Sequence, residues 1–177
     1  MGLGEHLLIV GAGNPLMGDD GAGIRVIESL LQNRHISVEV YDCGTDLLKI
    51  GSLEKQYDDI ILVDTVRTGT SPGTIHWFTQ KQLLSFSNSS SAHQISLLEA
   101  LALLPVMNPL FESVRFSIIG IEPETVSRTP ELSQPVRTSV RFLSDLLQTV
   151  DGLQKAITRC QETVETSGPA KHSTLRG

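Results

Sequence analysis

Apolar runs and helical repeats alternate along most of the chain. Short apolar or alternating stretches predict five β-strands, at residues 6–10, 37–42, 60–63, 74–78 and 114–121. Between and after them, apolar residues recur every three or four positions and predict helices over residues 24–34, 93–104 and 136–150, with a short helical segment near Leu47. This alternation favours an α/β fold of three layers, in which a central, mostly parallel sheet of about five strands carries helices on both faces.

Glycine, proline and serine set the expected ends of these elements. Pro105 is expected to end the helix that starts near His93, and Gly152 to interrupt the last helix. The serine-rich segment 85–91 and the polar segment 124–134 are expected to be surface loops. The strand at 74–78 follows a turn and is expected at a sheet edge.

The composition of the 177-residue chain fits one soluble domain. Residues 1–160 are expected to form a single domain, and the polar residues 161–177 a disordered tail. A net charge of −6 without a Lys/Arg run argues against nucleic acid or a membrane surface as the main partner. No segment approaches the roughly 20 apolar residues of a spanning helix, and two cysteines make no disulfide framework, so a cytoplasmic location is expected.

The stretch 7–23 runs from the first strand through a glycine-rich turn to two adjacent carboxylates. Because the carboxyl ends of parallel strands meet at one edge, Asp20 after the first strand and Asp64 after the third are expected there. His93 opens a helix on the same side, and two carboxylates with one imidazole predict an open site for nickel, zinc, iron or manganese. Taken singly, Asp64 could cap or turn the chain and His93 could be a packing residue. Asp19 is expected to be a helix cap.

Two alternative interpretations concern residues at the same edge of the sheet. Gly11 and Gly13 begin a dinucleotide-binding fingerprint, but Leu16 stands where the third glycine is needed. Asp42, near the end of the second strand, keeps a ribose-binding alternative open. Cys43 could be a nucleophile, but its neighbours supply no cation, and it is interpreted as a small buried hydrophobe.

Several motifs resemble those of the hydrogenase maturation endopeptidases, the proteases that trim the large-subunit precursor of nickel-iron hydrogenases. The resemblance spans roughly residues 7–150 and rests on GAGNPLMGDDGAG at 11–23, DCGT at 42–45, LVD at 62–64, PGT at 72–74, SAHQISL at 91–97 and GIEPE at 120–124. In the family, glycine usually occupies the position of Cys43. Carried over by position, the metal contacts of the family fall on Asp20, Asp64 and His93, and Gly44 and Thr45 are expected to contact the substrate.

The resemblance implies an endopeptidase that removes the C-terminal extension of the precursor after nickel insertion. Nickel would be carried by the substrate and held by Asp20, Asp64 and His93, either as a Lewis acid or as a recognition element. Two alternatives stay open: a nucleotide or small-molecule binding module that uses the Gly11–Gly13 turn, and a maturation chaperone that binds the precursor without cutting it. The sequence leaves the identity of the hydrogenase and the oligomeric state open.

Overall fold

The computed structural model describes residues 4–32, 38–86 and 92–162, apart from the side chains of residues 84–96. Its strands are β1 (Leu7–Ala12), β2 (Glu39–Gly44), β3 (Asp59–Thr65), β4 (Ile75–Thr79) and β5 (Arg115–Ile121). Its α-helices are α1 (Ala22–Gln32), α2 (Gln80–Phe86), α3 (Ala92–Met107), α4 (Gln134–Leu147) and α5 (Val150–Glu162). Three short 3-10 helices complete it: η1 (Gly18–Gly21), η2 (Leu47–Ser52) and η3 (Pro109–Phe111).

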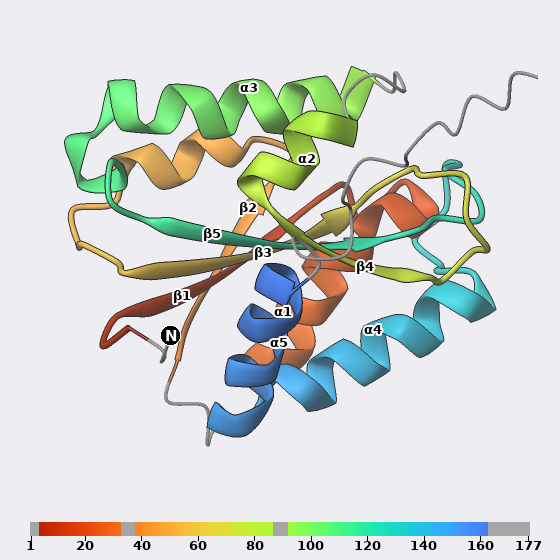
Figure 1. Ribbon diagram of the computed structural model, residues 1–177. Coiled ribbons are helices and arrows are strands. Elements are labelled where there is room, and N and C mark those ends of the chain that lie inside the picture. The colour runs from red at the N-terminus through yellow and green to blue at the C-terminus, as the bar shows by residue number, and fades with distance from the viewer. Residues whose placement is uncertain (1–3, 33–37, 87–91, 163–177) are drawn as a thin grey trace, which may run out of the picture.

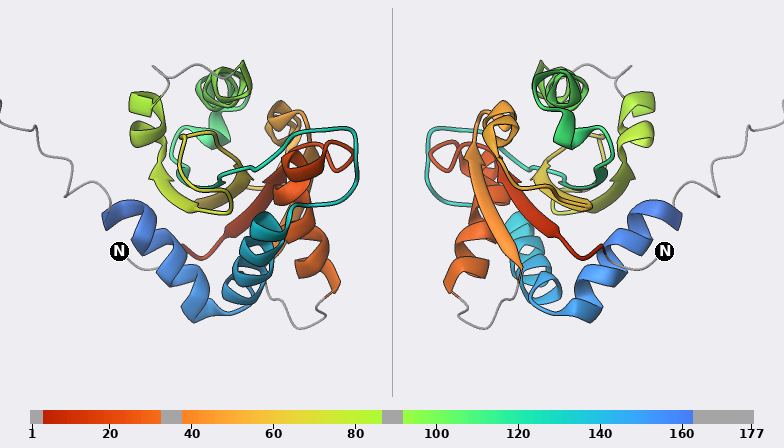
Figure 2. Two further views of the ribbon diagram at one scale, coloured as in Figure 1. Left: turned by 90° about the vertical axis from the view of Figure 1, so that its right-hand side faces the viewer. Right: turned by 90° about the vertical axis from the view of Figure 1, so that its left-hand side faces the viewer.

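The five strands form one sheet in the order β2-β1-β3-β5-β4. β1, β2, β3 and β5 are parallel, and β4 joins β5 antiparallel at the edge. In Figure 1, α2 and α3 cover one face of the sheet and α1, α4 and α5 cover the other, and the two views of Figure 2 show the same three layers. The predicted fold class and the edge position of the fourth strand are confirmed.

Each face of the sheet has its own hydrophobic core. β3 is buried along its whole length, so its side chains alternate between the two cores. Ile60 and Leu62 pack with α3 and η2, whereas Ile61 and Val63 pack with α1, α4 and α5. This double burial fixes β3 in the sheet centre and thereby fixes the position of the residues that follow Val63.

Pro105 does not end its helix, contrary to the expectation from the sequence. It lies inside α3, which continues to Met107. Proline removes only its own N–H from the helix ladder, and the N–H of Asn108 still donates to the carbonyl of Leu104 at 2.9 Å. The last turn therefore closes despite the missing bond.

The expected break at Gly152 is also wrong. The chain breaks at Gln148 and Thr149 instead, and Gly152 lies inside α5. A Cβ atom at this position would lie 1.7 Å from the carbonyl oxygen of Leu146. Glycine is needed because α5 turns back tightly on the end of α4, not because it disrupts a helix.

The expected loop 85–91 begins inside a helix that the sequence analysis did not predict. Residues 85 and 86 belong to α2, and residues 87–91 lie outside the described residues. Thr79 and Gln82 form a capping box, in which the Thr79 N–H donates to Gln82 Oε1 at 2.7 Å and the Gln82 N–H donates to Thr79 Oγ1 at 3.3 Å. The three-residue spacing of Thr79 and Gln82 can be recognised in the sequence, and the capping box that they form starts α2.

At the carboxyl end, residues 161 and 162 complete α5. The remainder of the expected tail, residues 163–177, lies outside the described residues. The division into a domain and a tail therefore stays a prediction. None of the helices in the described ranges combines the length and the apolar character needed to cross a bilayer.

Candidate active site

The glycine turn after β1 places Asp20 at the carboxyl edge of the sheet. Gly13 has a φ of 126°, and a Cβ atom there would lie 1.9 Å from the carbonyl oxygen of Asp20. The N–H of Asn14 donates to that same carbonyl at 3.2 Å. The chain thus folds back closely over Asp20, which only glycine at position 13 permits.

The carboxylate of Asp20 is directed toward the end of β3. It is partly exposed, and it accepts hydrogen bonds from the Asn14 N–H at 3.1 Å and from the Thr65 hydroxyl at 3.4 Å. Thr65 directly follows Asp64 in β3. Thr65 therefore contacts both carboxylates that were expected at this edge, because its hydroxyl donates to Asp20 and its N–H donates to Asp64.

Asp64 is 2% exposed and stands near the end of the central strand. One carboxylate oxygen accepts the N–H of Thr65 at 2.7 Å. Asp64 also lines a surface depression with a volume of about 140 Å³. Gly44 and Thr45, the expected substrate contacts, line the same depression.

His93 is the second residue of α3, one helical turn before Leu97, which also lines the depression. The structure thus brings Asp20, Asp64, Gly44 and Thr45 to one edge, whereas the side chain of His93 lies outside the described residues. Among the side chains that are described, no group of three His, Cys, Asp or Glu residues is arranged to hold a metal ion. The role of His93 stays a prediction.

Asp19 does not act as the expected helix cap. The first residues of η1 have no side-chain cap, and Asp19 is fully buried with its carboxylate turned toward another segment. It accepts three backbone N–H groups, from Glu124 at 2.9 Å, Thr125 at 3.0 Å and Ser133 at 2.7 Å. Asp19 therefore anchors the loop 122–133, which follows β5, to the turn that carries Asp20.

Glu122 anchors a second loop, residues 66–73, a role that the sequence analysis did not predict. It is 5% exposed and accepts bonds from the N–H groups of Thr68 and Gly69 and the hydroxyls of Thr68 and Thr70, at 2.7 to 3.2 Å. Burial acts to raise its pKa, but the bonds donated by these residues outweigh burial and lower the pKa. The only sequence signal was the motif GIEPE, which gave Glu122 no role.

His76 faces Glu122 from β4. Its Nε2 atom lies 3.6 Å from the Glu122 carboxylate and within hydrogen-bond distance of the hydroxyls of Thr68 and Thr70. Burial lowers the pKa of His76 despite the nearby carboxylate. The ring is therefore neutral at pH 7 and completes the polar cluster that holds loop 66–73.

Cys43 is buried, in agreement with its interpretation as a small hydrophobe. Its Sγ atom lies 3.1 Å from the carbonyl oxygen of Gly11, and burial, followed by the charges of Asp64 and Asp42, raises its pKa to about 12. The thiol stays protonated at neutral pH and is a poor nucleophile. Among the described residues only glycines have positive φ, so the cysteine fits here, and the left-handed position is taken by Gly44.

The carboxylate of Asp42 supports the turn that contains Gly44. One of its oxygens accepts the N–H of Gly44 at 2.8 Å. This contact explains the acidic residue at the end of β2 without a bound ribose. It gives the nucleotide-binding alternative no additional support.

Comparisons with known proteins agree with the resemblance. A family model described as hydrogenase maturation protease matches residues 24–150, a range that includes Asp64 and His93 and begins just after Asp20. The hydrogenase expression/formation protein HupD of Rhizobium leguminosarum bv. viciae is 29% identical over 67% of this chain, an alignment that spans only 59% of that relative. The hydrogenase 2 maturation protease of Escherichia coli (strain K12) is 27% identical over 68% of this chain and 75% of its own.

The fold agrees with a solved structure of similar description. The [NiFe] hydrogenase maturation protease HybD from Thermococcus kodakarensis superimposes with a TM-score of 0.70 over 80% of this chain and 95% of its own. The sequence identity is 24%, so this similarity concerns the fold.

Proposed function

Because the chain belongs to the hydrogenase maturation protease family, we propose that it is an endopeptidase that removes the C-terminal extension of a nickel-iron hydrogenase large-subunit precursor. The observation that supports this proposal is that Thr65 donates to both Asp20 and Asp64 at one edge of the sheet, where Asp64 lines an open depression. Two carboxylates at a strand edge next to a space for a peptide suit hydrolysis at a substrate-bound metal.

In this proposal nickel arrives as part of the substrate, after its insertion into the large subunit. Asp20, Asp64 and His93 contact the ion, since carboxylate oxygens and imidazole nitrogen are both ligands that nickel accepts. The Asp20 carboxylate accepts two hydrogen bonds, and a carboxylate has about four lone-pair sites, so it can also bind a metal ion. Asp20, being partly exposed, can reach an incoming ion without unfolding the turn.

Nickel has one of two roles here. As a Lewis acid it would polarise the scissile carbonyl or activate water, and as a recognition element it would only align the precursor. Replacing the nickel of the precursor with zinc, which prefers tetrahedral coordination, distinguishes these roles when binding and cleavage change to different extents.

The test is incubation of the chain with nickel-loaded and nickel-free precursor, followed by mass spectrometry of the large subunit. The mass is expected to fall by that of the C-terminal extension only when nickel is present. Binding without a mass change would favour a non-cleaving chaperone and contradict the proposal.

The site assignment is tested with Asp20→Asn and His93→Ala, both of which are expected to abolish shortening of the nickel-loaded precursor. Glu28→Gln is the matched control, because Glu28 is an exposed carboxylate on α1 that forms an ion pair with Arg25. Processing by both site variants at the wild-type rate would show that the chemistry lies elsewhere.

A further inference from the structure

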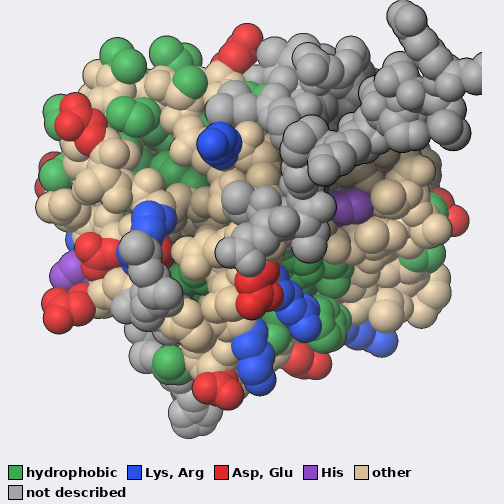
Figure 3. Space-filling view, in the orientation of Figure 1, with side chains coloured by type: hydrophobic (Ala, Val, Ile, Leu, Met, Phe, Trp, Pro, Cys, Tyr) green, Lys and Arg blue, Asp and Glu red, His purple; other side chains and the backbone are tan. Residues whose placement is uncertain are grey.

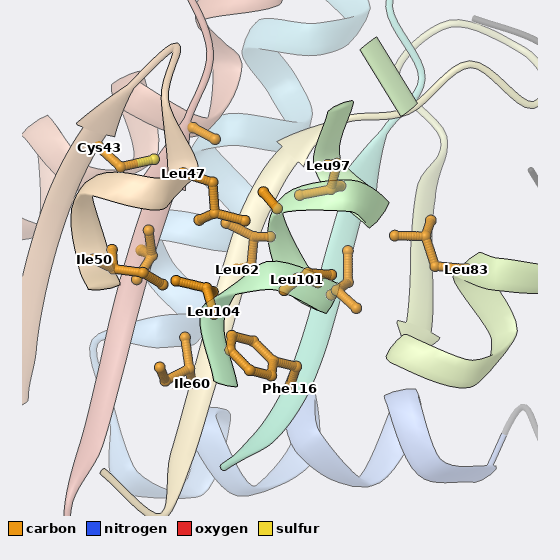
Figure 4. Packing of buried hydrophobic residues seen from close by; sticks show 14 of the residues in the cluster. Cys43, Leu47, Ile50, Ile60, Leu62, Leu83, Leu97, Leu101, Leu104 and Phe116 are labelled. Atoms are coloured by element: carbon orange, nitrogen blue, oxygen red, sulfur yellow. The ribbon is translucent and has the colours of Figure 1, made fainter. Parts of the chain in front are cut away.

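A groove leads away from Asp64 between η2 and α3. We call it the η2–α3 groove; its walls are formed by Thr45, Leu47, Leu48, Leu97, Ala100 and Leu103. Figure 4 shows Leu47 on η2 and Leu97 on α3 above the sheet. Ala12 and Gly13 contribute at the end where Asp64 lies. The groove is the same 140 Å³ depression that Asp64 lines.

The walls of the groove are mainly apolar, and its mouth is open. Leu47 and Leu97 are buried, whereas Leu103 is 46% exposed. Figure 3 shows hydrophobic side chains gathered over α3, and the exposed ones near its C-terminal end are Leu103, Val106 and Met107. A helix that is apolar on its outer face as well as its inner face normally contacts a partner.

The size and charge of the groove limit what can enter it. An apolar cavity of roughly 150 Å³ admits a benzene molecule, so a volume of 140 Å³ accommodates one branched aliphatic or aromatic side chain. The polar lining is acidic, with Asp46, Asp64 and Glu99, and the described lining contains no Lys or Arg. The mainly apolar walls and these carboxylates therefore favour an apolar side chain over an acidic one.

We propose that the η2–α3 groove is a specificity subsite that binds one apolar side chain of the precursor close to the scissile bond, with Leu103 as its main determinant. This inference rests on the proposed function, because the substrate backbone must pass Asp64 to be cut. Because Asp64 lines the same depression, an extended substrate that passes Asp64 can place a neighbouring side chain in the groove, since successive residues lie about 3.3 Å apart along such a chain. Leu48, half-buried on the opposite wall, closes the subsite.

The subsite is tested by changing its volume and measuring kcat and KM for nickel-loaded precursor. Leu103→Ala is expected to raise KM about tenfold with little change in kcat, because it removes apolar contact that is equal in the ground and transition states. Leu103→Trp should raise KM similarly by filling the groove. Leu31→Ala is the matched control, since Leu31 is 63% exposed on α1, across the sheet from the groove.

A second series identifies the side chain that enters. Each apolar residue of the precursor near the cleavage position is replaced singly by alanine. One replacement is expected to raise KM for the wild-type protease about tenfold but to add little to the effect of Leu103→Ala, as coupled partners do. Circular dichroism of each protease variant, including Leu48→Ala as a second probe of the subsite, verifies that the chain is folded.

The outcomes separate the two proposals. If the wild-type chain fails to shorten the nickel-loaded precursor, the proposed function is wrong and this subsite is wrong with it. If the wild-type chain shortens the precursor and folded Leu103→Ala, Leu103→Trp and Leu48→Ala match its KM, only the subsite is overturned.

Discussion

Asp19 and Asp20 are adjacent in the sequence, but their carboxylates have different roles. Asp19 is fully buried and its oxygens are taken by three backbone N–H groups of loop 122–133. Asp20 is partly exposed and its bonds come from Asn14 and Thr65 at the sheet edge. A buried, fully satisfied carboxylate stabilises structure, whereas a partly exposed one can exchange a ligand.

The first prediction separates these roles by substitution to the isosteric amide. Asp19→Asn is expected to lower the free energy of unfolding by about 2–4 kcal/mol, because an amide nitrogen would face buried N–H donors and the charge-assisted bonds would be lost. Urea denaturation measures this change. Asp20→Asn should cost clearly less stability while it removes activity. Equal losses of stability for the two variants would contradict the assignment.

The sequence predicted where Asp20 and Asp64 lie but not what Asp19 does. The position of the first two follows from a rule of topology, because residues after parallel strands gather at one edge. The partners of Asp19 are 105 to 114 residues away in the chain. No local pattern contains that information, so helix capping was the expected role and was wrong.

At the scale of single elements, α3 carries a proline that its packing tolerates. Pro105 has no N–H to donate to the carbonyl of Leu101, although the helix continues for two more residues. The second prediction is that Pro105→Ala raises the free energy of unfolding by about 1 kcal/mol or more, since alanine restores the bond and favours helix.

Thermal or urea unfolding measures the effect of this substitution. Pro109→Ala is the control, because Pro109 occupies the first turn of η3, where proline is favourable. That variant is expected to be neutral or slightly destabilised. Destabilisation by Pro105→Ala would show that the proline ring is needed for packing.

The loop 66–73 depends on Glu122, which gives the third prediction. The pKa of Glu122 is lowered in the folded protein, so the stability it contributes is present above its ordinary pKa of 4.5 and is lost as pH falls through the folded value. Glu122→Gln should therefore be less stable than wild type at pH 7 and should lose less stability on acidification below 4.5.

Unfolding curves between pH 7 and pH 3 measure this difference, and hydrogen exchange in loop 66–73 localises it. Glu39→Gln is the control, because the bonds from Lys55 and Tyr57 lower the pKa of Glu39 at the opposite end of the sheet. Glu39→Gln should weaken the dependence of the free energy of unfolding on pH below 4.5, but it should not speed hydrogen exchange in loop 66–73. An identical acid dependence in wild type and Glu122→Gln would contradict the role of Glu122.

The sequence predicted the presence of strands better than it predicted the residues at which helices end. All five strands were predicted: β3, for example, from an apolar run typical of a strand buried on both faces, and the partly exposed β2 from an alternating pattern. The errors arise where tertiary packing overrides a local signal. Gly152 reads as a helix breaker, yet it is required by the close approach of α5 to Leu146.

At the scale of the whole molecule, the sheet edge is held by two buried carboxylates on either side of the proposed reaction centre. Asp19 fixes loop 122–133 and Glu122 fixes loop 66–73, and both are nearly or fully buried. The fold class could be predicted from alternating elements. The anchoring of the loops could not, because it depends on side chains that meet only after the sheet has formed.

Three buried side chains, Cys43, Tyr57 and Cys160, make the stability of the fold depend on pH in the alkaline range. Burial raises the pKa of Cys43 and that of Cys160 to about 12. Burial, followed by the hydrogen bond that its hydroxyl donates to Glu39, raises the pKa of Tyr57 to about 12. A group whose folded pKa is raised favours folding while it is protonated, so this stability is complete below the unfolded pKa. For the thiols it is lost as pH rises from 9 toward 12.

The fourth prediction is therefore that the free energy of unfolding falls steadily between pH 9 and pH 12. The double variant Cys43→Ala, Cys160→Ala should show a shallower fall over the same window, because only Tyr57 then contributes among these three groups. Equilibrium urea denaturation at several pH values measures both slopes. A thiol reagent at pH 8 should label neither cysteine until urea unfolds the chain, since both are buried and protonated. Rapid labelling of the native protein, or equal slopes for the two chains, would show that the thiols are not held in the protonated, buried state.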